Sequence, residues 1–349
     1  MSTFFDNQAC NALEDIEVKD GTYFVTGATG FIGRYIVLSL LHICRHDKAR
    51  VKVIAAVRDK KKAEEIYRAY LQESYFEIME QDMTEPYHFD ENIDYLIHAA
   101  VRKQTVDNDS FSVFHDNMLA TKEILCFAQE KKVRKILLIS TCSVYGDLLL
   151  QGITDECHLG GNDSMNAKLC YAESKRASEY MFACGLEQMS LCGSVVRLFS
   201  VYGPGMDFAF PNVFADLFRQ AMFGEKITIN ESGQGVRNFS YIRDVIYGIF
   251  TVLYMGENGQ AYNVGSKNAD ISILGLAEKL GEKTGRRLEI EAGRLSPNGR
   301  ETIQAARMER IGSIAKQPAT SIEEGLEKMI SFYSNYVLPQ KVIDEMDSL

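Results

Sequence analysis

The chain has 349 residues, of which 46% are hydrophobic, and carries a formal net charge of −10 with a pI near 5.3. This length and composition indicate a globular protein with a substantial core, organised as two domains or one large domain. The acidic balance argues against nucleic acid and anionic membrane surfaces as partners, because proteins that bind them present basic surfaces. No apolar run approaches the ~20 residues of a membrane span, and the polar start of the chain is unlike a signal peptide. We therefore expect a cytoplasmic protein without membrane association.

The eight cysteines are scattered along the chain, with no C-x-x-C pair and no spacing typical of metal ligands. Reduced thiols are the simplest explanation of such a pattern. We expect no metal site.

Strands and helices are predicted to alternate through the first 200 residues. After a polar start with a possible short helix near 12–18, an apolar run at 23–26 ends in closely spaced glycines, and a helix follows to about residue 46. Further strands are predicted at 51–57, 76–79, 95–98, 136–140 and 194–199, and further helices at 60–73, 111–131 and 171–186. This alternation predicts an α/β fold with a Rossmann-type, doubly wound parallel sheet covered on both faces.

Beyond Tyr202 the pattern changes to longer loops and isolated strands, with helices predicted at 210–223, 243–255, 273–284 and 322–336. We interpret this part as a smaller, discontinuous α/β domain that closes over the carboxyl ends of the strands, where open α/β sheets bind their ligands. The expected division assigns 1–200 and 236–265 to an NAD(P)-binding domain. It assigns 201–235 and 266–349 to a substrate domain.

Three glycines at regular spacing, Gly27, Gly30 and Gly33, separate the first strand from the first helix. Gly27 permits a tight turn, Gly30 permits close approach of backbone N–H groups to an anion, and Gly33 permits close helix–strand packing. The new helix presents unpaired donors and the positive end of its dipole to a pyrophosphate. The stretch therefore predicts a dinucleotide site that includes Thr29, Phe31 and Ile32, although glycines also occur in turns that bind nothing.

A phenol and an ammonium, those of Tyr171 and Lys175, share one face of a predicted helix. A cation beside a phenol favours the phenolate, so we expect a lowered pKa and a usable proton acceptor at Tyr171. The preceding strand ends in hydroxyl residues, and Thr141 there can hydrogen-bond a substrate oxygen and share the proton. Exposed Tyr and Lys one turn apart are also common, but their coincidence with the glycine turn favours a catalytic role.

Together these motifs resemble the extended short-chain dehydrogenases, the NAD-dependent epimerase/dehydratase family that acts on nucleotide-linked sugars. The resemblance runs from about Gly21 to Tyr336. It implies that Thr141, Tyr171 and Lys175 are catalytic and that Asp82 lies near the adenine of the cofactor. It also implies cofactor contacts from Met83, His98, Ala99, Ala100, Asn117, Ser140, Tyr171, Lys175, Phe199 and Val201.

On the substrate side, the stretch 197–204 resembles the family motif R-x-x-N-x-Y-G-P, with Ser200 in place of the usual Asn. The stretches 211–213 and 233–239 resemble segments that hold the nucleotide. An acidic protein needs a dedicated guanidinium to hold a diphosphate, which favours Arg237 on a phosphate over a surface salt bridge, and Arg300 is a second phosphate candidate. The implied substrate contacts are Ser143, Ser200, Asn212, Val213, Arg237 and Arg300.

The two residues that directly follow Thr141 help to distinguish between the reactions of this family. The sugar 4,6-dehydratases of this family carry Asp-Glu there, and the uronate decarboxylases keep the Glu, whereas this chain has Cys142 and Ser143. Neither side chain supplies a carboxyl proton, so dehydration and decarboxylation are disfavoured. Epimerases of the family often have small residues at these positions.

Arg58 follows the second predicted strand, where members that prefer NAD usually carry Asp. With Lys60, Lys61 and Lys62 nearby, Arg58 can meet a 2′-phosphate, or it can stack on the adenine without reading the phosphate. The cofactor is therefore NAD or NADP.

The expected function is a nucleotide-diphosphate sugar epimerase that retains its cofactor and acts through a transient 4-keto sugar. Alternatives are an NADPH-dependent reductase of keto-sugar nucleotides, a sugar-nucleotide decarboxylase or dehydratase, and a non-catalytic nucleotide-binding protein. The family resemblance also implies a homodimer, paired through the helices that begin near residues 111 and 171.

Overall fold

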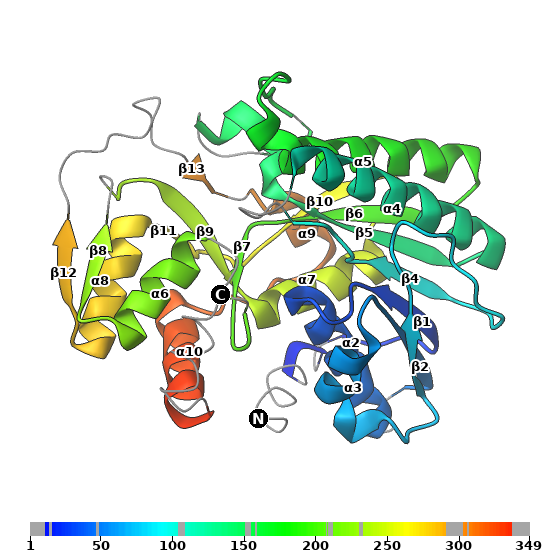
Figure 1. Ribbon diagram of the computed structural model, residues 1–349, viewed down its shortest axis with the longest axis horizontal. Coiled ribbons are helices and arrows are strands. Elements are labelled where there is room, and N and C mark those ends of the chain that lie inside the picture. Colours follow the sequence, from blue (N-terminus) through cyan, green and yellow to red (C-terminus); the bar gives the residue numbers. More distant parts are fainter. Residues whose placement is uncertain are drawn as a thin grey trace.

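A seven-stranded sheet is the largest element of the computed structural model, which describes residues 11–13, 16–46, 49–103, 109–150, 155–157, 159–206, 208, 212–229, 233–290, 303–305 and 307–336. Its strands are all parallel, in the order β10-β6-β5-β4-β1-β2-β3 (Figure 1). They are β1 (Gly21–Thr26), β2 (Val51–Val57), β3 (Phe76–Glu80), β4 (Tyr95–His98), β5 (Lys135–Thr141), β6 (Gly193–Leu198) and β10 (Ala261–Val264). The expected doubly wound α/β fold is confirmed.

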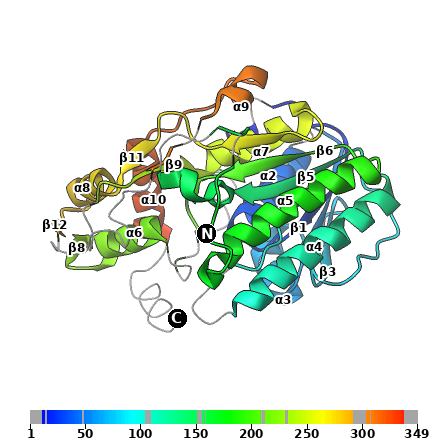
Figure 2. The same cartoon turned by 90° about the horizontal axis from the view of Figure 1, so that it is seen from above.

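Helices cover both faces of this sheet. Figures 1 and 2 show α2 (Phe31–Arg45) and α7 (Ile242–Met255) on one face, and α4 (Ser110–Lys131) and α5 (Cys170–Gln188) on the other. Side chains of β1 alternate between them, since Tyr23 and Val25 belong to one buried cluster and Phe24 to the other. Burial on both faces explains why the central strands are mostly apolar, whereas the edge strand β3 carries two exposed glutamates.

The order of the strands reverses between β1 and β4. Chains leaving β1 and β4 therefore diverge to opposite faces, which opens a crevice at the carboxyl ends of these strands. The glycine turn follows β1, and the stretch His98–Ala100 begins at the last residue of β4, so the sequence places its cofactor candidates at this switch point.

A smaller part packs beside the carboxyl ends of the large sheet (Figure 1). Its strands β7 (Ser200–Tyr202), β9 (Val236–Tyr241), β11 (Asp270–Ser272) and β13 (Ile303–Gln304) form one sheet, and β8 (Lys226–Ile229) pairs with β12 (Arg287–Ile290). Its helices are α6 (Val213–Phe223), α8 (Ile273–Thr284) and α10 (Ile322–Tyr336), while α9 (Glu309–Ile314) lies near α7 and β10. The two-domain division remains a prediction; within it, β9 pairs with the smaller sheet and α7 and β10 lie with the large one.

The loop that enters the smaller part is fastened to α2 and α10. The Tyr35 hydroxyl donates to the Pro204 carbonyl at 2.8 Å, and the Arg34 guanidinium donates to the Gly205 carbonyl. The Gly205 N–H in turn donates to the Tyr333 hydroxyl at 3.2 Å. Gly205 has a φ of 75°, which glycine adopts without strain.

Two predicted helices differ from the structure. The helix expected at 60–73 ends as α3 (Lys60–Ile66), and a 3₁₀ turn, η2 (Arg68–Tyr70), follows. Tyr67 and Tyr70 are both buried, and a 3₁₀ turn aligns residues three apart on one side. The helix expected near 12–18 is only η1 (Asn11–Leu13) among the residues described. The helix predicted at 210–223 is α6, which begins at Val213, and residues 210 and 211 lie outside the described residues.

Within the described parts of the chain, no helix combines the length and apolarity needed to cross a membrane.

Candidate active site

The glycine turn has the backbone geometry of a phosphate cradle. Gly27 has a φ of 63°, and a Cβ there would lie 2.7 Å from the Ala100 backbone nitrogen. A Cβ at Gly33 would overlap the Gly27 carbonyl oxygen, so this position also requires glycine. Gly30 caps α2 without a side chain, and the first turn of α2 has no acidic residue. The turn therefore fits a dinucleotide pyrophosphate held by backbone N–H groups.

The loop after β4 is held against this turn by Thr26. Backbone N–H groups of Ala99 and Ala100 donate to the Thr26 hydroxyl at 3.2 and 3.1 Å. The hydroxyl hydrogen is then directed to Nδ1 of His98, 2.9 Å away. Burial, with the nearby charge of Lys175, lowers the pKa of His98 to about 3, so the imidazole is neutral.

Tyr171, Thr141 and Lys175 meet at the carboxyl end of β5. Tyr171 and Lys175 lie one turn apart in α5, and Thr141 is the last residue of β5. The Tyr171 phenol hydrogen-bonds the Thr141 side chain, and Lys175 Nζ donates to the Ile139 carbonyl at 2.7 Å. The structure thus brings the three predicted catalytic residues together.

The expected pKa of Tyr171 is wrong for this structure. Burial, with a smaller contribution from Cys142, raises the pKa of Tyr171 to about 12, although the hydrogen bond from Thr141 acts in the opposite direction. Lys175 does not offset this, because its ammonium is turned to the Ile139 carbonyl and is itself buried, which lowers its pKa to about 8. Tyr171 is therefore a protonated phenol at neutral pH in this state.

Asn117, a cofactor contact implied by the family resemblance, joins two parts of the site through its side-chain amide. Its Oδ1 accepts from the Arg102 backbone N–H at 2.8 Å, and its Nδ2 donates to the Arg102 carbonyl and to Ser174 Oγ. One buried amide thus ties the loop after β4 to α5, which carries Tyr171 and Lys175.

At the other end of the crevice, Arg58 is exposed at the end of β2. The neighbouring Asp59 carboxylate accepts from the Lys62 N–H at 3.0 Å and caps α3. Asp82 accepts from the Thr84 N–H and hydroxyl, and these bonds, with the charges of Arg58 and Arg102, lower its pKa. Met83 follows Asp82 and is half-buried.

Arg237, from the smaller sheet, lies near the carboxyl end of β5, where Thr141, Tyr171 and Lys175 meet. We call this region the catalytic edge. Arg237 lies on β9 opposite Gln304 of β13, and its charge lowers the pKa of Cys142, whereas burial raises that pKa to about 11 overall. Cys142 Sγ lies 4.0 Å from Gln304 Oε1, and the Ser143 N–H and hydroxyl lie 3.3 Å from Thr141 Oγ1. The edge thus carries a neutral thiol, hydroxyls, an amide and a guanidinium.

The other candidates are more dispersed. The Asn212 side chain accepts from the Ala215 N–H and caps α6, in which Val213 is the first residue. Ser200 and Val201 lie on β7 beside β9, and Phe199 is buried against Cys142 and Tyr145. Arg300 lies outside the described residues.

Two further groups lie close to the predicted site. Gln304 lies on a strand of two residues, too short to give a pattern. Glu179 binds Ser140 and Arg197 from one turn beyond Lys175. The four-residue spacing from Lys175 to Glu179 was the signal that could have found it.

The chain resembles curated proteins over most of its length. It is 26% identical over 307 residues to UDP-glucuronic acid decarboxylase 6 of Arabidopsis thaliana, covering 87% of this chain and 86% of that protein. It is 26% identical over 329 residues to dTDP-D-glucose 4,6-dehydratase of Homo sapiens, covering 88% and 89%.

Solved structures share the fold. UDP-glucuronic acid 4-epimerase from Bacillus cereus, in complex with UDP-glucuronic acid and NAD, superposes with a TM-score of 0.74 at 23% identity, covering 90% of this chain and 99% of that one. dTDP-glucose 4,6-dehydratase from Bacillus anthracis, in complex with NAD, gives 0.72 at 19% identity, covering 90% and 97%. The family model of the NAD-dependent epimerases and dehydratases matches residues 23–265, a span that includes the glycine turn, Tyr171 and Lys175. The chain therefore belongs to the NAD-dependent epimerase/dehydratase family, whose members are extended short-chain dehydrogenases.

Proposed function

We propose that the protein is a nucleotide-sugar epimerase that retains a nicotinamide cofactor and acts through a transient 4-keto sugar. The observation that carries this proposal is the meeting of Thr141, Tyr171 and Lys175 at the end of β5, followed by two residues without carboxyl groups. Cys142 is a neutral thiol and Ser143 a hydroxyl, so neither delivers the proton that a departing hydroxyl needs.

Tyr171 is the proposed proton carrier. Its deprotonated oxygen, the phenolate, takes up the proton of the sugar hydroxyl when the sugar carbon is oxidised, and the resulting phenol returns that proton when the keto sugar is reduced. An oxidised nicotinamide, when bound, supplies reversible hydride acceptance and a positive charge that favours the phenolate. Thr141 shares the substrate oxygen, and Lys175 is the proposed cation that turns from the Ile139 carbonyl toward the phenolate when Tyr171 is deprotonated.

The proposed contacts follow the arrangement of the crevice. The glycine turn, the loop His98–Ala100 and Asn117 hold the pyrophosphate and ribose side of the cofactor, and Asp82 and Met83 lie on the adenine side. Arg237 holds a phosphate of the nucleotide sugar, with Ser143, Ser200, Asn212 and Val213 as further substrate contacts.

Product analysis tests the proposal. We expect purified protein to carry bound cofactor and to interconvert two epimers of a nucleotide sugar without net change in NAD(P)H absorbance. UDP-glucuronic acid, UDP-glucose and dTDP-glucose are the substrates to compare, because these compounds occur in the names of related enzymes and of enzymes with the same fold. Release of carbon dioxide or loss of water would instead identify a decarboxylase or a dehydratase. Inertness together with absent cofactor would identify a non-catalytic nucleotide-binding protein.

An NADPH-dependent reductase is the second candidate, and Arg58 favours it. Arg58 is exposed at the end of β2, and the three lysines that follow it closely, Lys60, Lys61 and Lys62, are exposed as well. The adjacent Asp59 is engaged as a helix cap, so its carboxylate is directed to backbone N–H and not to the ribose.

The reductase candidate predicts that Arg58→Ala weakens NADPH binding by about 10- to 100-fold, because a charged hydrogen bond to the 2′-phosphate contributes about 1.5–3 kcal/mol. NADH binding should stay nearly unchanged, and both constants can be measured by nucleotide fluorescence. Arg68→Ala, at another exposed arginine, is the control. Equal affinity of the wild type for NADH and NADPH would contradict a contact between Arg58 and the 2′-phosphate and leave Arg58 as a residue that stacks on adenine.

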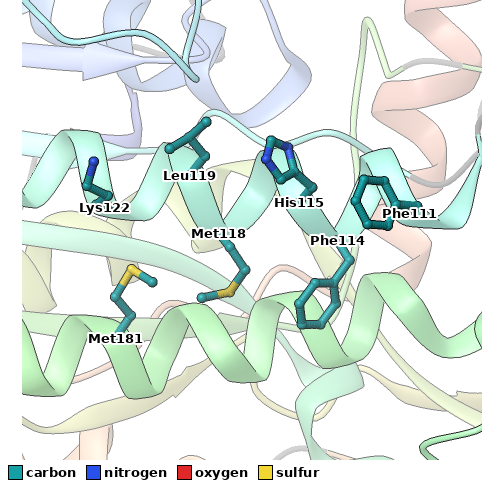
Figure 3. A pocket seen from close by; sticks show the side chains of 7 residues that line it. All are labelled: Phe111, Phe114, His115, Met118, Leu119, Lys122 and Met181. Carbon is teal, nitrogen blue, oxygen red and sulfur yellow. The ribbon is translucent and has the colours of Figure 1, made fainter.

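We also propose a homodimer formed through α4 and α5. Figure 3 shows an apolar pocket on the outer surface of these helices, with Phe114 and Met118 directed toward α5. The side chain of Phe111 is 78% exposed and that of Phe114 is 39% exposed. The pocket is lined by Phe111, Phe114, His115, Met118, Leu119, Lys122 and Met181.

Phe114→Glu is expected to raise the dimer dissociation constant by about 30-fold or more, since a central apolar contact contributes about 2 kcal/mol and a carboxylate would be buried in its place. Sedimentation equilibrium measures the change. Leu71→Glu is a matched control, because Leu71 is an apolar side chain of similar exposure, 38%, away from α4 and α5. A wild type that stays monomeric at high concentration would contradict the proposal.

The seven cysteines in the described residues are free thiols. Unpaired thiols are typical of proteins kept in a reducing compartment. We propose the cytoplasm as the location.

A further inference from the structure

A buried ion pair lies behind the catalytic edge. Arg197 of β6 donates through Nη2 to Glu179 Oε2 at 2.7 Å, and its Nε lies 3.2 Å from both carboxylate oxygens. The two side chains are only 6% and 9% exposed. Such pairs are costly to desolvate and contribute little net stability, so the contacts of this pair suggest what else it does.

Glu179 and Lys175 hold two consecutive residues of β5. The Ser140 hydroxyl donates to Glu179 Oε1, and Lys175 Nζ donates to the Ile139 carbonyl. Ser140 directly precedes Thr141, whose hydroxyl meets the Tyr171 phenol. The carboxylate therefore fixes the helix that bears the phenol and ammonium to the strand that bears the hydroxyl.

The other end of Arg197 holds the residues that follow Thr141. Its Nη1 lies 3.2 Å from the Tyr145 hydroxyl, which donates to Asn263 Oδ1 at 2.6 Å. Tyr145 belongs to the 3₁₀ segment η3 (Cys142–Leu150), which begins immediately after Thr141. The pair thus restrains the catalytic stretch on both sides of Thr141.

We propose that Glu179 is a positioning residue of the active site, which sets the place of the Thr141 hydroxyl and the charge of Lys175 without touching the substrate. The proposal rests on the proposed function for its effect on turnover. Its effect on Lys175 does not depend on turnover.

The charges around Lys175 single out Glu179. Burial lowers the pKa of Lys175 to about 8, and Glu179 opposes that shift. His98 of β4 also faces Lys175 but is neutral, and Arg197 faces Glu179. Asn117, Thr121, Ser140, Cys142 and Tyr171 around this turn of α5 are uncharged at neutral pH. Arg176 and Glu173 of the same turn carry opposite charges and pair with each other at 3.6 Å. Removing the carboxylate charge should therefore lower the pKa of Lys175 further.

Glu179→Gln is the first test, since the amide keeps the shape and removes the charge. We expect kcat to fall by about 10- to 100-fold with little change in KM, because small misplacements of catalytic groups reduce rate on this scale. The alkaline limb of the kcat–pH profile should move to lower pH, because the Lys175 ammonium would lose its proton earlier. Glu179→Asp, which keeps the charge, should return the limb toward its wild-type position.

Asp244→Asn is the matched control. Asp244 is a buried carboxylate on α7 that accepts from the Thr320 N–H and hydroxyl at 2.8 Å, away from the catalytic edge. Asp244→Asn should alter the stability of the protein but leave the alkaline limb of the kcat–pH profile unchanged. If Glu179→Gln fails to fold, Ser140→Ala removes only the hydroxyl that binds Glu179, and it should lower kcat with the wild-type pH limb.

A titration independent of turnover separates the two proposals. In protein labelled with [ε-¹³C]lysine, the Lys175 signal, assigned with Lys175→Arg, should titrate at lower pH in Glu179→Gln than in the wild type. A wild type inert toward all nucleotide sugars would contradict the proposed function, while this shift would still support the coupling. An unchanged Lys175 titration, or unchanged kcat and pH profile in an active enzyme, would overturn the positioning role.

Discussion

Tyr171→Phe is expected to lower turnover by about 10²- to 10⁴-fold, the usual contribution of a positioned acid–base group. The substitution removes one hydroxyl, which hydrogen-bonds Thr141, and leaves the ring in place. Binding of NAD(H) should persist, because the glycine turn is untouched. Initial rates with the active nucleotide sugar and fluorescence titration of cofactor measure the two effects.

The matched control is Tyr180→Phe. Tyr180 lies on the same helix but is 67% exposed, so loss of its hydroxyl should leave both rate and cofactor binding unchanged. A Tyr171→Phe enzyme with wild-type turnover would contradict the proton-carrier role.

Gly33→Ala is expected to weaken cofactor binding by about 10- to 100-fold. The new Cβ would overlap the Gly27 carbonyl oxygen, a backbone atom that cannot move aside without opening the turn. Forcing a methyl group into such a contact costs about 1–3 kcal/mol, and that strain lowers the binding constant by the stated factor if the pyrophosphate requires the closed turn. Calorimetric titration with NAD measures the affinity.

Gly312→Ala serves as the comparison, because a Cβ at Gly312 would meet no atom within 4 Å. Its cofactor affinity should equal that of the wild type. Unimpaired binding by Gly33→Ala would show that the cofactor does not depend on the closed form of this turn.

The large sheet was predictable from the sequence because its central strands are buried on both faces. The runs 53–57 and 136–139 are apolar without interruption, so their pattern shows the strand directly. The glycine turn and the Tyr171–Lys175 spacing were predictable for a related reason. Both are local, since neighbours in sequence are neighbours in the site.

Features that depend on distant contacts were not predictable. Gln304 reaches Cys142 only because β13 pairs with β9. The raised pKa of Tyr171 comes from burial under the folded chain, which the sequence does not display. The early end of α3 follows from burial of Tyr67, whose hydroxyl donates to the Ala28 carbonyl at 2.6 Å.

The fastening of Pro204 and Gly205 to Tyr35, Arg34 and Tyr333 constrains how the two parts of the molecule move against each other. α2, the helix that begins at the glycine turn, hydrogen-bonds the Pro204–Gly205 peptide, which leads into the smaller part. A hinge at Pro204–Gly205 would have to break these bonds, one of them buried. If the two parts move apart to admit a nucleotide sugar, we expect the bending to occur at other connecting segments, while the peptide 204–205 stays fixed to α2 and α10.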